Sequence, residues 1–178
     1  MTQRNPLALA AATTVALLAT ATPALADSIA TLHDAGGTAI GKATLTQTPN
    51  GVLLRVDATG IAKGEHAFHI HETGKCDGGD GFKSAGGHFA LEHEHGYQVE
   101  AGPHPGDMPN VQVHADGLFA IEFINPAVSL QEGKPGYLFD ADGSALVIHA
   151  KADDYRSQPS GDAGDRIACG VIERAKTD

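Results

Sequence analysis

The sequence predicts an all-β domain, an antiparallel sandwich or flattened barrel of about eight strands. Short runs with strand character recur along the chain, and Gly, Pro, Asn and Asp separate them. No segment of useful length beyond residue 26 has the apolar period of a helix. Several short strands with turn residues between them are typical of antiparallel sandwiches and barrels.

The predicted strands include two hairpins. Asn50-Gly51 lies between two strand-like runs, and this dipeptide is a strong hairpin signal. Ala115-Asp116-Gly117 is the predicted turn of the second hairpin. We expect strands at 28–32, 38–46, 52–58, 66–71, 111–114, 118–124, 145–150 and 167–172.

Two connections, 72–110 and 151–165, are too long to be ordinary turns. Long segments without regular structure in a compact domain are usually functional or disordered. The first holds several histidines and a cysteine, which favours a function. We therefore expect two long functional loops.

Residues 1–26 predict a secretory signal peptide. Arg4 gives a positively charged start, Leu7–Thr20 is apolar, and Ala24-Leu25-Ala26 has the small-x-small form of a cleavage site. The alternative is a transmembrane anchor, but the apolar stretch is short for a span. We expect one mature domain, 27–178, in the periplasm or secreted, with no membrane contact after cleavage.

The chain is acidic, with a formal net charge of −10, and loss of Arg4 with the signal peptide makes the remainder more negative. This charge argues against nucleic acid and anionic membranes as partners. A small anionic substrate is not excluded, because a local field can oppose the global one.

Cys76 and Cys169 are the only cysteines. Export to an oxidising compartment favours a disulfide between them. The alternative is a pair of thiols with metal affinity, although histidines already supply ligands. The bridge would tie the 72–110 loop to the C-terminal strand.

Six histidines and one aspartate are candidate metal ligands. Neutral imidazole is the commonest transition-metal ligand, and one carboxylate among imidazoles suits zinc or copper. Seven ligands are too many for one tetrahedral site, so two metals that share a ligand is the economical interpretation. The set is His69, His71, His88, His95, His104, Asp107 and His149.

Strand parity separates the histidines of the 66–71 run. Phe68 and Ile70 indicate the core face, so His69 and His71 leave the opposite face as a pair suited to one metal. His66 falls on the apolar face, where a structural histidine bonded to backbone is expected rather than a ligand.

The other candidates depend on loops and a second strand. His149 follows a strand-like run, and His88 follows two glycines that let the backbone approach a site closely. His104 and Asp107 can chelate locally. His93 competes with His95, and spacing alone cannot choose between them. His33 and His114, near strand ends, are expected to be solvated.

Five motifs follow one another along the chain: HAFHIHE at 66–72, AGGHF at 85–89, GPHPGD at 102–107, LVIHAKADD at 146–154 and GDRIACGVI at 164–172. Together and in this order they resemble the copper/zinc superoxide dismutases, especially the secreted bacterial branch. The resemblance spans nearly the whole predicted mature chain. It implies an eight-stranded antiparallel Greek-key β-barrel or sandwich, and these enzymes are known sandwich proteins.

The resemblance also implies copper and zinc as cofactors. It assigns His69, His71 and His149 to copper and makes His88 the imidazole that bridges the two metals. The family pattern completes the zinc site with His95, His104 and Asp107. It favours His95 over His93, because a glycine, Gly96, follows His95.

Three further roles follow from the same resemblance. Asp153 would link a copper-bound and a zinc-bound imidazole, and such carboxylates fix ring orientation and tautomer. Arg166 matches the arginine beside the copper channel, and Cys76–Cys169 matches the family disulfide.

The implied reaction is dismutation of superoxide by redox-cycling copper. His88 would release copper and take a proton on reduction, while zinc fixes His88 and its loop. The 153–166 segment is shorter than in eukaryotic members, so the charges that steer the substrate remain open, with Lys83 and Lys151 as candidates.

Two other functions compete with this one. A periplasmic copper- and zinc-binding protein without turnover would be expected to lack a copper ligand or the channel arginine, and this sequence has both. The second is metal-assisted hydrolysis, which is disfavoured because the sequence shows no obvious general base beside an open metal position. The sequence leaves monomer and homodimer open.

Overall fold

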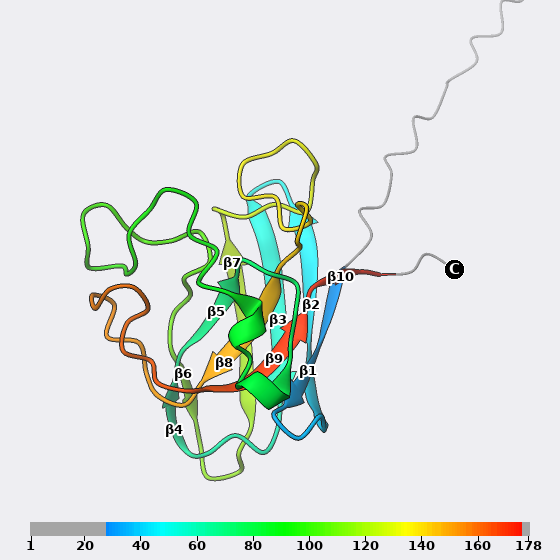
Figure 1. Ribbon diagram of the computed structural model, residues 1–178, viewed down its shortest axis with the longest axis vertical. Coiled ribbons are helices and arrows are strands. Elements are labelled where there is room, and N and C mark those ends of the chain that lie inside the picture. The colour runs from blue at the N-terminus through cyan, green and yellow to red at the C-terminus, as the bar shows by residue number, and fades with distance from the viewer. Residues whose placement is uncertain (1–27, 176–178) are drawn as a thin grey trace, which may run out of the picture.

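The computed structural model describes residues 28–175, which form ten strands and two short 3-10 turns (Figure 1). The predicted signal peptide lies outside the described residues. Within 28–175 no helix is long and apolar enough to cross a membrane. The strands are β1 (Ser28–Asp34), β2 (Ala39–Thr48), β3 (Gly51–Ala58), β4 (Gly64–His66), β5 (Phe68–His71), β6 (Val111–Val113), β7 (Phe119–Asn125), β8 (Ala145–His149), β9 (Arg166–Val171) and β10 (Glu173–Arg174).

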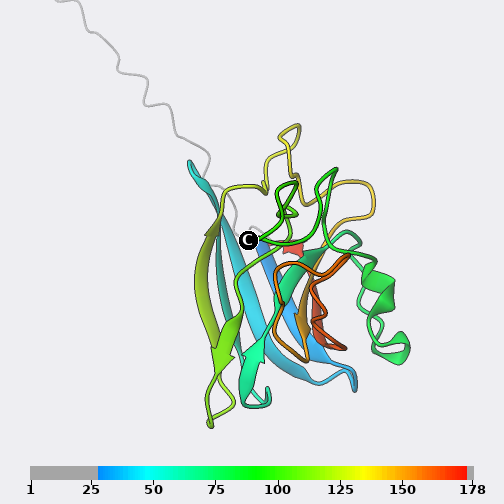
Figure 2. The ribbon, with the colours of Figure 1, turned by 90° about the vertical axis from the view of Figure 1, so that its left-hand side faces the viewer.

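The strands form one curled antiparallel sheet in the order β5-β8-β9-β1-β2-β3-β7, with β10 beside β1. A two-strand pair, β4-β6, continues it, because β4 runs into β5 after one residue. Three pairings in this order join strands that are not consecutive in the chain, β5 with β8, β9 with β1 and β3 with β7, as in a Greek key. Figure 2 shows β2, β3 and β7 on one side and β8 and β9 on the other. The predicted all-β fold is confirmed.

The core lies between these two sides and follows the period-2 pattern of the strands. On β3, Val52, Leu54 and Val56 are buried, while the residues between them are more exposed. Phe68 of β5 packs edge-to-face on Phe119 of β7, with ring centroids 5.5 Å apart. This contact joins the two sides of the curled sheet.

The first predicted hairpin exists, but its turn is shifted by one residue. Pro49 and Asn50 lie between the strands, and Gly51 already pairs with Thr48. Gly51 has φ +123°, and a Cβ there would overlap the backbone of Asn125 on β7. A third strand therefore fixes the glycine, a constraint that the local sequence does not reveal.

The predicted 66–71 strand is divided at Ala67. The part before it, β4, pairs with β6, and the part after it, β5, pairs with β8. The predicted parity holds within β5, because Phe68 and Ile70 lie in the hydrophobic core. His66 is buried, and its ring nitrogens lie 2.8 Å from the carbonyl oxygens of Ala62 and His149. This agrees with the predicted structural role of His66.

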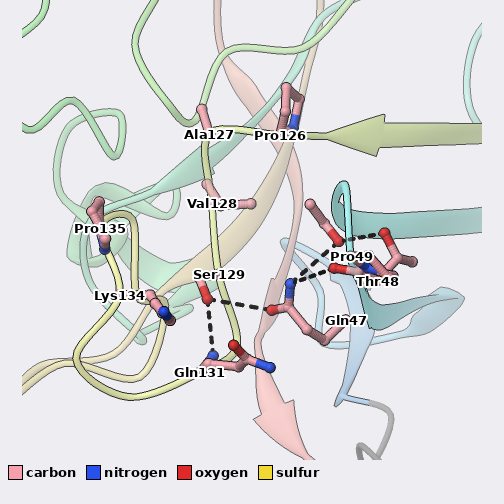
Figure 3. Close-up of a pocket in the computed structure, with 11 residues that line it drawn as sticks. Gln47, Thr48, Pro49, Pro126, Ala127, Val128, Ser129, Gln131, Lys134 and Pro135 are labelled. Carbon is pink, nitrogen blue, oxygen red and sulfur yellow. Dashed lines mark hydrogen bonds between the residues drawn. The ribbon is translucent and has the colours of Figure 1, made fainter.

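The two predicted long loops are present, and the first contains η1 (Gly78–Asp80) and η2 (Lys83–Ala85). A third long connection, residues 126–144, was not predicted. The Gln47 side chain holds it near the β2–β3 turn by accepting hydrogen bonds from the Ser129 hydroxyl and the Leu130 N–H. Figure 3 shows the pocket between this loop and that turn, whose lining includes none of the candidate ligands.

Candidate metal centre

The first cluster consists of four buried histidines from two strands and the first long loop: His69, His71, His88 and His149. His69 of β5 pairs with Val147 of β8, so strand parity places His69, His71 and His149 on the same face of the sheet. The first loop delivers His88 through an isolated bridge to His71. One side-chain nitrogen from each residue lies within 4.8 Å of the others.

The hydrogen bonds of these rings fix which nitrogens face inward. Nδ1 of His71 lies 3.1 Å from the Gly86 carbonyl, and Nδ1 of His149 lies 3.5 Å from the Gly164 carbonyl. A carbonyl only accepts, so each Nδ1 carries the proton and each Nε2 keeps a lone pair. These two Nε2 atoms lie 3.4 Å apart.

Two inward-facing nitrogens have no partner among the described residues: Nδ1 of His69 and Nε2 of His88. Buried polar atoms are rarely left unpaired, so each such atom needs an explanation. Two unpaired nitrogens and two facing lone pairs fit a cation held by four imidazoles.

The second cluster is built around Asp107. Its Oδ2 accepts hydrogen bonds from the N–H groups of Gly96 and His104, which hold the carboxylate in place. Its Oδ1 faces the Nδ1 atoms of three histidines, at 2.9 Å from His88, 3.1 Å from His95 and 3.3 Å from His104. Three imidazoles and one carboxylate form a donor set that suits a four-coordinate zinc ion.

His88 belongs to both clusters. Its Nδ1 faces the second cluster and its unpaired Nε2 faces the first. One imidazole therefore presents a nitrogen to each group of ligands.

Asp153 links the two clusters a second time. Its Oδ2 lies 2.8 Å from Nε2 of His69, and its Oδ1 lies 2.9 Å from Nε2 of His95. Because the carboxylate occupies both Nε2 atoms, Nδ1 is the nitrogen that each ring turns toward its cluster. Gly161 makes room for this link, because a Cβ there would overlap Asp153 and the His95 ring.

The pKa values reflect burial and the two carboxylates. Burial, together with the neighbouring rings, lowers the pKa of His88 to about 4 and that of His149 to about 2. Burial alone would lower the pKa of His95, but hydrogen bonds to Asp107 and Asp153 outweigh it and raise that pKa to about 9. Hydrogen bonds from His104, His88 and His95 outweigh burial and hold the pKa of Asp107 far below its usual range.

Arg166 lies at the start of β9, half-buried beside the first cluster. Its guanidinium donates hydrogen bonds of 2.6 Å to the carbonyls of Phe82 and Gly86. Burial lowers the pKa of Arg166 and the Asp80 and Glu72 carboxylates oppose this, but an arginine side chain stays charged. Arg166 is thus a fixed cation near the histidines.

The disulfide Cys76–Cys169 joins the first long loop to β9. It was expected, and it excludes the alternative of two free thiols. Cys76 precedes Phe82 and Gly86 in the loop, so the bridge anchors the segment whose carbonyls hold Arg166.

All seven predicted ligands meet in these two clusters, in the two groups that the resemblance implied. His95 lies in the second cluster, whereas His93 is exposed. His114 is exposed, as expected, and His33, which pairs with Cys169 across β1 and β9, is half-buried.

Asn110 and Gln158, which sequence reasoning did not single out, contact the backbone of Asp153 and His95 respectively. These side chains bond to the backbone of residues far along the chain, and such a contact depends on the fold and produces no recognisable motif in a single sequence.

Comparisons with known proteins agree with this geometry. The family model for copper/zinc superoxide dismutase matches residues 39–172. A copper/zinc superoxide dismutase of Aquifex aeolicus is 50% identical over 139 residues, which cover 77% of this chain and 82% of the relative. One from Caulobacter vibrioides is 46% identical over 137 residues, or 75% of this chain and 78% of the relative.

Solved structures show the same fold. A superoxide dismutase-like protein of Bacillus subtilis aligns with TM-score 0.77 and 37% identity, over 81% of this chain and 97% of that one. The copper/zinc enzyme of Brucella abortus aligns with TM-score 0.66 and 27% identity, over 83% and 99%. This chain belongs to the copper/zinc superoxide dismutase family.

Proposed function

We propose that this protein is a superoxide dismutase, which converts superoxide into O2 and hydrogen peroxide. The observation that carries the proposal is the position of His88 in two buried four-residue clusters, one of imidazoles alone and one containing a carboxylate. Bound copper supplies the electron transfer, in which one superoxide is oxidised to O2 and a second is reduced to hydrogen peroxide with two protons.

The proposed copper ligands are Nδ1 of His69 and Nε2 of His71, His88 and His149. Support comes from the two unpaired nitrogens and from the lone pairs of His71 and His149 that face each other. The proposed zinc ligands are Nδ1 of His88, His95 and His104 and an oxygen of Asp107, a donor set with no soft ligand and one carboxylate.

His88 and Arg166 are the proposed catalytic residues. Nε2 of His88 has no hydrogen-bond partner among the described residues, so this nitrogen can hold a proton next to the reacting anion when it is not bound to copper. Arg166 presents planar donors and a fixed charge, so it can bind and orient a small anion near the histidines. Its hydrogen bonds to Phe82 and Gly86 fix the guanidinium before the anion arrives.

The approach of superoxide needs a local positive field, because the whole chain is strongly acidic. Lys151 is a proposed contributor, since its stem lies against Gly164, whose carbonyl faces His149. Lys83, exposed in η2, is a second. If Lys151→Gln or Lys83→Gln leaves the ionic-strength dependence of the rate unchanged, that lysine does not steer the substrate.

We also propose that residues 1–26 direct the chain to the periplasm or outside the cell and are then removed. An intramolecular disulfide suits an oxidising compartment, and the relatives are bacterial copper/zinc enzymes. Mass spectrometry of the mature protein should find Asp27 at its N-terminus. Sedimentation analysis would decide between a monomer and a homodimer, which the sequence leaves open.

The decisive experiment measures superoxide decay with the copper- and zinc-loaded protein, its His149→Ala variant and a control, His114→Ala, which changes an exposed histidine. We expect activity in the protein and the control and a loss of at least about 100-fold in His149→Ala, because removing a ligand should cost at least as much as removing a partner that orients one. An inactive, fully loaded protein would instead support the metal-binding alternative.

A further inference from the structure

Two side-chain amides join the long loops at the metal centre. Gln158 of the second loop donates from Nε2 to the His95 carbonyl at 2.9 Å, and its Oε1 accepts from the His95 N–H at 3.0 Å. Asn110, at the end of the first loop, makes the same pair of bonds with Asp153, at 2.9 Å and 2.8 Å. Each amide thus satisfies both backbone groups of one residue in the other loop.

The two residues held in this way contact each other. Nε2 of His95 and Oδ1 of Asp153 lie 2.9 Å apart and are fully buried. Neither residue belongs to a strand, so no ladder of backbone hydrogen bonds fixes its main chain. The bonds from Gln158 and Asn110 take the place of that ladder.

We propose that Gln158 is a positioning residue for zinc: by holding the backbone of His95, it aims that imidazole and slows zinc release. Asn110 does the same for Asp153, whose carboxylate orients the His95 ring from the other side. This inference rests on the proposed function, because it takes His95 as a zinc ligand. It makes the shorter second loop a structural part of the zinc site.

Other contacts between the loops provide a matched control. Arg156 of the second loop donates from Nε to Oε1 of Gln98 in the first, and both residues are exposed. This contact joins the same two loops without bonding to the backbone of a proposed ligand. Gln98→Ala therefore tests whether any contact between the two loops slows zinc release, or only one that holds the backbone of a ligand. Gln158 is also exposed, so its replacement leaves the core intact.

The experiment follows zinc release from the copper- and zinc-loaded protein into an excess of a chromogenic chelator. We expect Gln158→Ala to release zinc about tenfold faster, at the lower end of the effect of losing a partner of a metal ligand. Gln98→Ala should release zinc at the wild-type rate, and copper release should change little in either variant. Cobalt bound in place of zinc should show shifted visible bands in Gln158→Ala only.

Three results would overturn the inference: wild-type zinc release from Gln158→Ala, an equal acceleration in Gln98→Ala, or equal acceleration of copper and zinc release. The His104→Ala variant separates this from the proposed function. If zinc binds His104→Ala as tightly as the wild type, the zinc site itself is wrong, and the inference falls with it.

Discussion

Arg166 and His71 donate hydrogen bonds to the same carbonyl oxygen, that of Gly86, at 2.6 Å and 3.1 Å. One peptide group therefore positions the proposed anion-binding cation and orients a proposed copper ligand. The Glu72 carboxylate holds the next residue, because it accepts a 2.8 Å hydrogen bond from the Gly87 N–H. Gly86 needs to be glycine, with φ +74°, since a Cβ there would crowd the Glu72 side chain.

Arg166→Lys should slow superoxide decay about tenfold with unchanged metal content. Lysine keeps the charge but cannot bond to both carbonyls and still present planar donors to an anion. A loss of this size corresponds to about 1.4 kcal/mol, which is typical of one hydrogen bond to a charged group. Stopped-flow decay at several ionic strengths measures it. Arg55→Lys, on the outer face of β3 and paired with Glu122, is the control; a wild-type rate in Arg166→Lys would refute the role.

Asp153→Asn should lower the affinity for both metals by about 10- to 100-fold, which is the usual effect of losing a partner that orients metal ligands. The carboxylate accepts from His69 and His95 together, whereas an amide turns its NH2 group toward one of the two ring N–H groups. Competition with chelators of known affinity measures the change. Asp154→Asn is the control, since the side chain of Asp154 is exposed and bonds only within 154–157; equal losses in both variants would contradict the prediction.

Much of this site could be predicted because strand parity is local. The alternation of Phe68 and Ile70 with His69 and His71 placed two ligands on one face, and the structure keeps that alternation within β5. The break itself arises because β6 and β8 pair with different halves of the run. Such a division depends on partners far along the chain, which no local pattern reveals.

The choice between His93 and His95 shows where local reasoning ends. A neighbouring glycine distinguished them only through the family pattern, and the structure gives its physical cause. Gly96 has φ +103°, and a Cβ there would overlap the Tyr155 carbonyl of the second loop. The requirement for glycine thus comes from Tyr155, in a loop far from Gly96 in the sequence.

Zinc binding to the metal-free protein should release about one proton at pH 7.5, with the number falling toward zero above pH 9. His95 has a pKa of about 9, so it is protonated at pH 7.5 and must lose that proton to bind zinc. His88, with a pKa of about 4, is already neutral and contributes none. Calorimetry in buffers of different ionisation enthalpy counts the protons. Release that does not change between pH 7.5 and 10 would contradict the assignment to His95.

Reduction of Cys76–Cys169 should lower the free energy of unfolding of the metal-free protein by several kcal/mol. The bridge spans 93 residues, and the chain-entropy model gives about 4 to 5 kcal/mol for a loop of that size. Urea unfolding with and without reductant measures the difference, and the Cys76→Ala/Cys169→Ala double variant should not respond to reductant. Reduction should also lower the rate of the loaded enzyme, because it frees the segment whose Phe82 and Gly86 carbonyls hold Arg166. Unchanged stability on complete reduction would show that the packing of the loop against β9, rather than the bridge, holds that segment.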